Sequence, residues 1–251
     1  MNMPKAFLLS VVLSNIMLGG CASKVTEEGQ YSGFLPSYAG LQQTTSANGQ
    51  PVMRWVAEGF NPDAYDTVAF DQLELYPAPK PDERINLQTL RELQSLTGTS
   101  VRSALAQKYT IVSGVDAASA NDRTLVLNAA ITGVTASNEG MHWYEVLPLT
   151  AVAGVVSGAA GYRDQNTELY VEADLLDLAT GESVVKIVRK VLGDTLGSSR
   201  QAITADDFKS AIKGLADDVN AFVNTRHEAN NPSVAEDIVV VTCVTCIGTA
   251  H

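Results

Sequence analysis

The sequence has few of the residues from which catalytic and metal sites are usually built. It contains three histidines and three cysteines, and no two histidines stand at positions i and i+4. No Gly-x-Ser-x-Gly element precedes a helical pattern, and no glycine-rich loop runs into a Lys-Ser or Lys-Thr pair. We therefore expect no catalytic residue, no metal site and no cofactor.

Basic residues are also scarce. The chain has 17 Lys and Arg against 28 Asp and Glu, which gives a formal net charge of −11 at pH 7. Nucleic acids and anionic lipid head groups are attracted by basic surfaces, so this balance disfavours both as partners of the protein surface. The sequence predicts no nucleic-acid partner.

No apolar run is long enough for a membrane-spanning helix, which needs about 20 residues. The chain has two apolar runs, at 6–18 and 146–162. The longer one, VLPLTAVAGVVSGAAGY at 146–162, contains Pro148 and is rich in glycine. We interpret it as a buried or surface-packed segment. A patch that docks on a membrane or a partner is the alternative, because Gly154 and Gly158 have the spacing that lets helices approach closely.

The N-terminus has the layout of a secretory signal. Lys5 precedes the short apolar run AFLLSVVLSNIML at 6–18, and the tetrapeptide LGGC at 18–21 follows. This boundary resembles the lipobox of bacterial lipoproteins, in which lipid is attached to the cysteine and a peptidase cuts before it. We expect residues 1–20 to be a lipoprotein signal peptide and Cys21 to carry lipid such as palmitate, which makes the membrane a partner.

The residue after the lipidated cysteine predicts the destination. In many Gram-negative bacteria an Asp at this position retains a lipoprotein in the inner membrane, whereas here the position is Ala22. We therefore expect anchoring in the outer membrane, with the protein facing the periplasm.

Two cysteines, Cys243 and Cys246, remain in the C-terminal part once Cys21 is lipidated. An oxidising periplasm favours a disulfide between them. The preceding residues 238–241 have strand character, however, and side chains three apart in a strand point to opposite faces. A disulfide therefore requires a turn at 244–245, and both a Cys243–Cys246 disulfide and two free thiols stay open.

The mature chain is expected to consist of a membrane tether, one domain and a tail. Residues 21–50 are polar and small and suggest the tether, although Tyr31, Phe34 and Leu35 are apolar enough for part of it to pack on the domain. Residues 51–225 are predicted to form a single α+β periplasmic domain. Residues 226–251 are predicted to be a connector and C-terminal tail.

Periodicity predicts a mainly antiparallel sheet with two helices packed on one face. We expect strands at 109–112 and 123–134, one long strand with a bulge at 65–76, and a hairpin of 167–178 and 183–192. Glu172 and Asp174, on the first strand of this hairpin, are predicted to lie on a face of the sheet that is exposed to solvent.

Two helices follow from apolar residues at helical spacing. The first is capped by Asn86 and carries Gly98, where a kink or break is predicted. The second begins at a capping box from Thr204 to Asp207 and is expected to bury Val219 while Asp218 faces solvent.

Four motifs resemble a known family. They are SGFLPSY at 32–38, the pair Arg54-Trp55, the pair Tyr65-Asp66, and VEADLLDLATGE at 171–182. Together they resemble an uncharacterised lipoprotein family catalogued as domain of unknown function 3313, over most of residues 31–224. The resemblance implies a periplasm-facing lipoprotein and brings no catalytic residues with it.

Two functions compete on this basis. The first is a non-enzymatic envelope accessory or binding protein that contacts an envelope protein partner through its sheet edge or residues 146–162. The alternative is a periplasmic enzyme of the hydrolase class, with a site assembled around His142 and the strand carboxylates Glu172 and Asp174.

Overall fold

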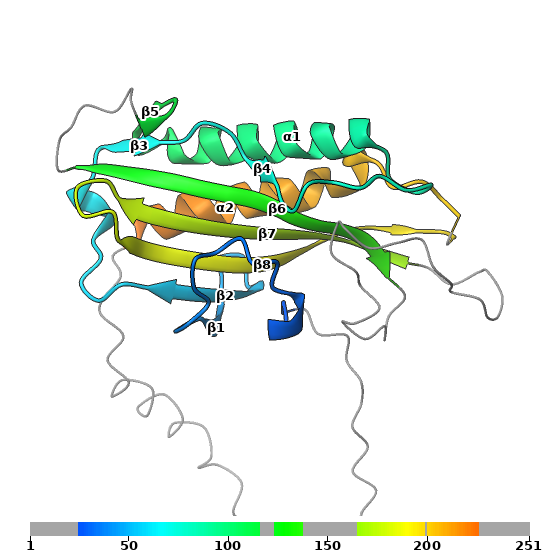
Figure 1. Ribbon diagram of the computed structural model, residues 1–251, viewed down its shortest axis with the longest axis horizontal. Coiled ribbons are helices and arrows are strands. Elements are labelled where there is room, and N and C mark those ends of the chain that lie inside the picture. Colours follow the sequence, from blue (N-terminus) through cyan, green and yellow to red (C-terminus); the bar gives the residue numbers. More distant parts are fainter. Residues whose placement is uncertain (1–24, 116–122, 138–164, 199, 226–251) are drawn as a thin grey trace, which may run out of the picture.

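The computed structural model describes residues 25–115, 123–137, 165–198 and 200–225 (Figure 1). Within these ranges the strands and helices are, in chain order, β1 (Gln42–Thr45), β2 (Pro51–Val56), β3 (Thr67–Ala69), β4 (Glu74–Leu75), α1 (Leu87–Leu105), β5 (Thr110–Val112), β6 (Thr124–Ser137), β7 (Gln165–Asp177), β8 (Ser183–Leu196) and α2 (Lys209–Asn224).

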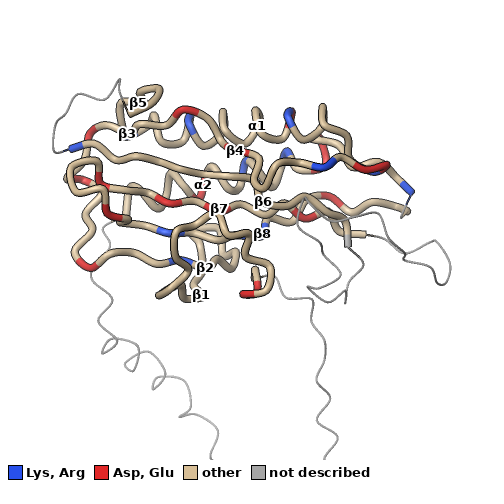
Figure 2. Tube along the Cα trace, in the orientation of Figure 1, with Lys and Arg blue, Asp and Glu red and all other residues tan. Residues whose placement is uncertain are grey.

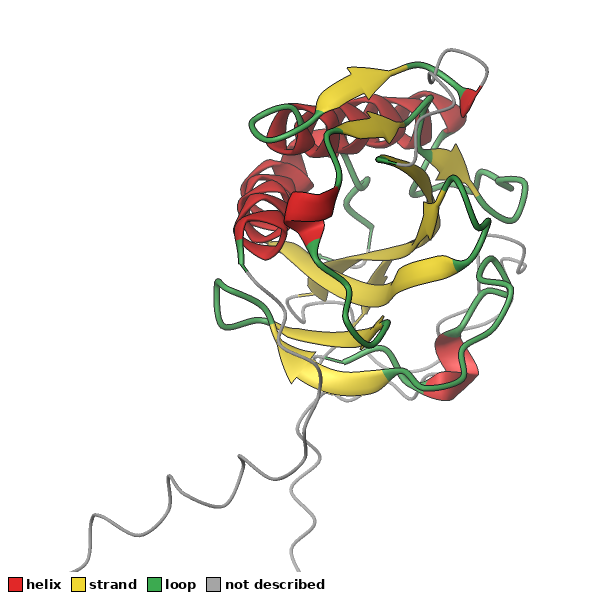
Figure 3. Cartoon of the chain, turned by 90° about the vertical axis from the view of Figure 1, so that its left-hand side faces the viewer, coloured by secondary structure: helices red, strands yellow, loops and turns green. Residues whose placement is uncertain are grey.

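The strands of the described ranges form one 8-stranded sheet in the order β1-β2-β8-β7-β6-β3-β5, with β4 paired to β6. The pairs from β1 to β6 along this order are antiparallel, and the three pairs that involve β3 or β4 are parallel. Seen from the end, the strands form a curved layer and α1 lies beside α2 (Figure 3). The predicted α+β class with a mainly antiparallel sheet is confirmed.

The single long strand predicted at 65–76 is wrong. The chain forms β3, leaves the sheet after Ala69, and returns as β4, and both short strands run parallel to β6. The break allows Phe70 and Leu73 to be buried together in the core, each with 1% of its surface exposed. The change in apolar phase therefore marks a break in the strand rather than a bulge.

Helix α1 begins as predicted, because the side chain of Asn86 accepts a hydrogen bond from the Thr89 amide at 2.8 Å. The break considered at Gly98 does not occur, and the helix continues to Leu105. Gly98 packs against Leu73, where an added Cβ would lie 3.6 Å from the Leu73 Cβ. Tertiary packing along the helix thus holds it straight through the glycine.

Helix α2 is preceded by the predicted capping box. The amide of Thr204 donates to Oδ2 of Asp207 at 2.7 Å, and a 3-10 turn at Ala205–Phe208 leads into the helix. Phe208 and Ile212 are almost completely buried and fix the start of α2 on the core. Neither helix in the described parts of the chain is long and apolar enough to cross a membrane.

The folded domain extends further toward the N-terminus than residue 51. Strand β1 lies within the segment assigned to the tether, and Thr26 and Leu35 have only 2% and 4% of their surface exposed. Residues 25–41, here called the N-terminal segment, contact the outward face of the sheet: Ser32 and Tyr38 bind Glu172 on β7, and Lys186 on β8 binds carbonyls of the segment. Apolar and aromatic residues in this segment thus pack on the sheet, as their composition suggested.

Candidate functional site

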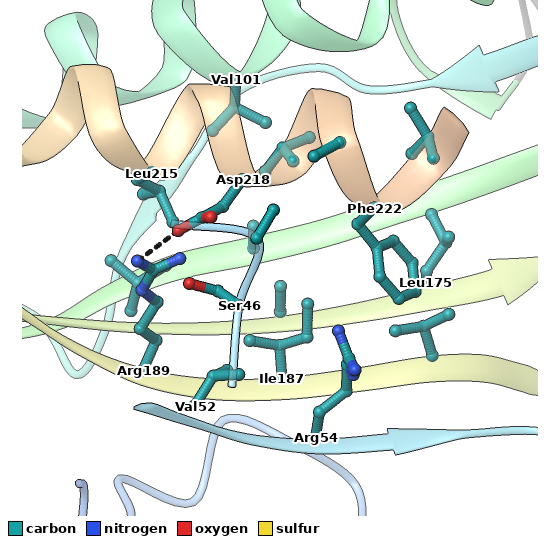
Figure 4. A pocket seen from close by; sticks show the side chains of 18 of the residues that line it. Ser46, Val52, Arg54, Val101, Leu175, Ile187, Arg189, Leu215, Asp218 and Phe222 are labelled. Carbon is teal, nitrogen blue, oxygen red and sulfur yellow. Dashed lines mark ion pairs between the residues drawn. The ribbon is translucent and has the colours of Figure 1, made fainter. Parts of the chain in front are cut away.

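A cavity of about 350 Å³ lies between the sheet and α2 (Figure 4). Its sheet wall includes Leu127 from β6, Leu175 from β7 and Ile187 from β8, and its helix wall includes Val219 and Phe222 from α2. A volume of this size falls within the range of small-molecule binding sites, roughly 300–1,000 Å³. The cavity is therefore large enough to hold a ligand.

The strand register explains why the space is hollow. Ala129, Ala173, Ile187 and Arg54 stand opposite one another on β6, β7, β8 and β2, so their side chains share the cavity face of the sheet. Two of the four are alanines, which leave the middle of this row shallow. Close packing, the rule in protein interiors, is thus not reached between this row and α2.

The side chains around the cavity keep part of their apolar surface accessible. Ile187, Val219 and Phe222 point inward, yet each is only partly buried. The exposed lining residues Thr45, Ala47 and Thr225 mark the mouth, between the β1–β2 turn and the end of α2. Removing apolar surface from water contributes roughly 25 cal/mol of favourable free energy per Å². Binding of an apolar group that enters through this mouth would therefore be favourable.

Three charged residues line the cavity, and two of them neutralise each other. Nη2 of Arg189 lies 2.5 Å from Oδ2 of Asp218, and both side chains are buried. Oδ1 of Asp218 also accepts a hydrogen bond from the Asn48 amide at 2.8 Å, which ties the β1–β2 turn to α2. The ion pair therefore contributes no net charge to the cavity.

Arg54 is the remaining charged residue of the cavity wall. Its guanidinium carbon lies 5.0 Å from the centre of the Phe222 ring, and burial lowers the pKa of its side chain. Among the described residues it has no carboxylate within ion-pair distance. The cavity wall thus carries one positive charge that is not neutralised.

The prediction that Asp218 faces solvent is wrong. Asp218 is 5% exposed, whereas its neighbour Asp217 is exposed and pairs with Lys213 at 2.7 Å. Position 218 lies at the edge of the apolar face of α2. Helical periodicity alone does not determine there whether a side chain points to the core or to solvent. Arg189, at an inward position of β8, provides the partner that makes burial of this carboxylate favourable.

The outward face of the sheet carries a polar cluster beneath the N-terminal segment. Oε1 of Glu172 accepts the Ser32 amide at 2.8 Å, and Oε2 accepts the Tyr38 hydroxyl at 2.6 Å. Glu172 is completely buried and Asp174 is 4% exposed, so the predicted solvated sheet face is wrong at both positions. The reason is coverage, because the N-terminal segment shields this face from water.

Lys186 holds the next part of the N-terminal segment. Its Nζ donates to the carbonyls of Ser37 at 3.1 Å and Ala39 at 3.0 Å, and lies 4.6 Å from the Trp55 ring centre. Lys186 on β8 stands opposite Asp174 on β7, and Nζ of Lys190 on β8 lies 3.5 Å from Oε1 of Glu168 on β7. Acidic and basic positions along the chain are coloured red and blue in Figure 2. Burial raises the pKa of Asp174, and the nearby Lys186 offsets part of this effect.

A contact between Tyr65 and Asp177 joins two of the motifs from the sequence, the pair Tyr65-Asp66 and residues 171–182. The hydroxyl of Tyr65 donates to Oδ2 of Asp177 at 2.8 Å, and burial together with this bond raises the pKa of Tyr65 to about 12. Oδ1 of Asp177 accepts the amides of Ala179 and Thr180, which shapes the β7–β8 turn. In that turn Gly181 has φ +70°, a conformation that glycine adopts without strain.

These contacts assign a structural role to several of the motif residues. Glu172, Tyr38 and Lys186 fasten the N-terminal segment to the sheet, and Asp177 forms the hairpin turn. The pair Arg54-Trp55 divides between the two faces, because neighbouring strand residues point in opposite directions. Arg54 faces the cavity, whereas Trp55 lies beside Lys186 on the outward face.

Several predicted site residues lie outside the described ranges. They are Cys21, His142, Cys243 and Cys246, together with residues 146–162. Within the described ranges no group of His, Cys, Asp and Glu residues is arranged to hold a metal ion. Glu172 has both its carboxylate oxygens occupied by the N-terminal segment.

The sequence reasoning missed the cavity and Arg54. A signal was present, because Arg54 follows Val52 at inward positions of β2. Arg189 similarly follows Val185 and Ile187 on β8. A charged residue in an apolar, inward-facing strand position indicates a buried partner or a cavity.

The fold and the cavity define a small α+β domain with a hollow apolar interior and, in its wall, one cation that no carboxylate of the described residues neutralises. The chain belongs to the family described as protein of unknown function (DUF3313), whose family model matches residues 30–219. This confirms the family to which the four sequence motifs pointed.

A relative of known sequence supports this assignment, and two solved structures show a distant similarity. The chain is 37% identical over 207 residues to the uncharacterized lipoprotein YdcL of Escherichia coli (strain K12), covering 82% of this chain and 91% of the relative. The PelC dodecamer from Paraburkholderia phytofirmans is similar with a TM-score of 0.35 and 14% identity, covering 67% of this chain and 96% of that chain. A neuraminyllactose-binding hemagglutinin homolog from Helicobacter pylori has a TM-score of 0.33 and 8% identity, covering 66% and 84%.

Proposed function

We propose that the protein is a lipoprotein of the outer membrane, anchored through lipid on Cys21 and facing the periplasm, and that it acts as a non-enzymatic binding protein of the envelope. The tetrapeptide LGGC at 18–21 and the lipoprotein relative support the anchor. Ala22, in place of an Asp, supports export to the outer membrane.

The cavity is the observation that carries the binding role. Among the described residues that line it there is no histidine, and the one carboxylate, that of Asp218, is paired with Arg189. Acid–base and nucleophilic catalysis need a side chain that can exchange a proton or attack a bond. The hydroxyl groups in the lining are those of Thr45, Ser46 and Thr225, and none has a histidine or an unpaired carboxylate beside it among the described lining residues to act as a base. The apolar surface and the guanidinium of Arg54 therefore support binding rather than catalysis.

We also propose that both helices cover the same face of the sheet. Val101 and Leu105 of α1 line the cavity together with Leu215 of α2 and the inward residues of the strands. The opposite face is occupied by the N-terminal segment at Glu172 and Lys186. This arrangement leaves the cavity mouth and the N-terminal segment on different parts of the surface.

The anchor is tested by labelling cells with palmitate. The Cys21→Ala variant should remain an unprocessed precursor without label, and the wild type should fractionate with the outer membrane. An Ala22→Asp variant should keep its label but move to the inner membrane. Equal labelling of Cys21→Ala and wild type would contradict the lipoprotein assignment.

Binding in the cavity is tested with Nile red, a neutral dye that brightens in apolar sites. The mature chain 21–251 carrying Cys21→Ser should enhance its emission, and Val219→Trp, which fills the cavity, should abolish the enhancement. Lys213→Trp places the same side chain on the exposed face of α2 and should leave dye binding unchanged. Absence of enhancement with the folded wild-type domain would contradict the binding role.

A further inference from the structure

We propose that the cavity between the sheet and α2 binds a fatty acid, with the apolar chain between the sheet wall and Phe222 and the carboxylate on Arg54. This inference rests on the proposed binding function and specifies its ligand class. It follows from the shape, the lining and the charge of the cavity, taken in turn.

The lining selects an apolar chain. Apart from Arg54, Ser46 and the Arg189–Asp218 pair, the inner wall consists of aliphatic side chains from both helices and four strands, together with the ring of Phe222. Each methylene transferred from water to such a wall contributes roughly 0.8 kcal/mol. A polar ligand such as a sugar or a peptide would lose its hydrogen bonds to water there without replacement.

The charge selects an anion. Because Arg189 and Asp218 neutralise each other, an empty or neutrally filled cavity keeps the charge of Arg54 without a counter-ion. A carboxylate fits a guanidinium with two parallel hydrogen bonds, which are stronger than bonds between neutral groups. A cationic head group in the same place would be repelled at short range.

The position of Arg54 matches a head group near water. Arg54 lies on β2, next to the edge strand β1, where it stands opposite Gln42, and its side chain is partly exposed. The apolar wall extends from there across β8, β7 and β6 through Ile187 and Ala173. A single chain can thus enter the interior while its carboxylate stays at the rim of the sheet.

The net charge of −11 does not oppose this ligand. Surface charge acts over a Debye length of roughly 10 Å and slows the approach of an anion, but burial of the chain supplies most of the affinity. Arg54 then decides between head groups on contact. Selectivity should therefore be local and should depend on this one side chain.

The test compares ligands that share one chain and differ only in charge. Laurate, dodecyltrimethylammonium and dodecyl phosphate are titrated, below their micelle concentrations, against Nile red bound to the mature chain 21–251 carrying Cys21→Ser. Laurate should displace the dye at a concentration at least about tenfold lower than dodecyltrimethylammonium, as expected for one charge-assisted contact. This comparison uses the unaltered cavity and does not depend on the folding of a variant.

The variants then assign the selectivity to Arg54. Arg54→Leu should raise the laurate concentration needed to displace the dye by about 10-fold to 100-fold. Laurate and dodecyltrimethylammonium should then displace the dye at similar concentrations. Arg123→Leu, which removes an exposed guanidinium paired with Asp66, should keep the wild-type preference. Circular dichroism checks that each variant is folded, and Arg54→Gln replaces Arg54→Leu if the latter does not fold.

Each other outcome overturns the inference. Equal displacement by laurate and dodecyltrimethylammonium would remove the role of Arg54. Displacement by dodecyl phosphate well below the laurate concentration would assign a phosphate-headed ligand instead. Dye binding without displacement by laurate would refute the fatty acid and leave the binding function standing, whereas failure of the dye to bind would refute the binding function itself.

Discussion

Arg189 on β8 and Asp218 on α2 form an ion pair at 2.5 Å across the apolar cavity, with only 7% and 5% of their side chains exposed. Two charges withdrawn from water lose much hydration free energy, so the pair stabilises the fold only while both partners are present. Since Asp218 also binds the Asn48 amide, the pair connects the helix, the sheet and the β1–β2 turn.

Asp218→Ala should therefore be strongly destabilising. It leaves the buried Arg189 without its counter-ion and the Asn48 amide without its acceptor, and loss of one partner of a buried pair costs about 3–5 kcal/mol of unfolding free energy. Urea unfolding followed by circular dichroism measures this loss.

The matched control is Asp217→Ala, one residue earlier on α2. Asp217 forms an exposed i,i+4 pair with Lys213, which is worth about 0.3–0.5 kcal/mol. Equal unfolding midpoints for the two variants would show that Asp218 is not buried in solution.

Tyr38→Phe should loosen the N-terminal segment. It removes the hydroxyl that donates to Glu172 and that accepts the Gly33 amide, so a buried carboxylate oxygen loses its partner at a cost of about 1–3 kcal/mol. Hydrogen exchange at Ser32 and Gly33 should become faster.

Tyr31→Phe is the control for this variant, because Tyr31 stacks on Tyr38 with ring centres 4.5 Å apart. It keeps the stacked ring and removes only a hydroxyl that no hydrogen bond described here uses. If both variants exchange at the same rate, the contact with Glu172 is not what holds the segment.

Gly98→Ala should stabilise the protein by about 0.4–1 kcal/mol. The glycine lies inside α1, and an added Cβ would meet Leu73 at 3.6 Å, an ordinary contact. Alanine reduces the conformational entropy of the unfolded chain and has the higher helix propensity. Thermal unfolding measures the gain.

Gly193→Ala on β8 provides the opposite case. Its Cβ would overlap with the Thr167 side chain and would lie 2.5 Å from the Asp207 carbonyl oxygen, so the start of α2 must shift. The melting temperature should fall for Gly193→Ala and rise for Gly98→Ala. A fall in both would mean that α1 has no room at Gly98.

Asp174→Asn should stabilise the protein at neutral pH and lose this effect in acid. Burial raises the pKa of Asp174 above its ordinary value of 3.8, so the folded state binds the proton more tightly than the unfolded state. The associated stability is fully present below the ordinary pKa and is lost as pH rises through the raised pKa. Melting temperatures of variant and wild type should therefore differ at pH 7 and converge below about pH 4. A constant difference at all pH values would contradict this origin.

Local signals predicted both helices, β6 and the β7–β8 hairpin, but they predicted neither β1 and β2 nor the division of residues 65–76 into β3 and β4. The caps at Asn86 and Thr204 and the glycine turn at Gly181 depend on neighbours within four residues, and each is found where it was expected. The environments of Glu172 and Asp218 depend on residues more than a hundred positions away, Tyr38 and Asn48. Alternation fixes on which face a side chain lies, but not whether another segment covers that face.

The same distinction applies to the cavity. Helical spacing predicted that Val219 faces the sheet, and it does. The space beneath Val219 is hollow because the strand register places Ala129 beside Ala173, opposite α2. Register between strands that are not joined by a short turn has no local signature, so this part of the site required the structure.

The contact of the N-terminal segment with the sheet sets how far the domain can stand from its anchor. Thr26 is already buried in the domain, and it lies five residue steps along the chain from Cys21, with four residues between them. A fully extended chain spans about 3.5 Å per residue. If Cys21 carries lipid, as proposed, the segment between Cys21 and Thr26 can therefore extend to about 18 Å at most. The domain would then be confined to the surface of the bilayer, where fatty acids are released and taken up, rather than ranging across the periplasm.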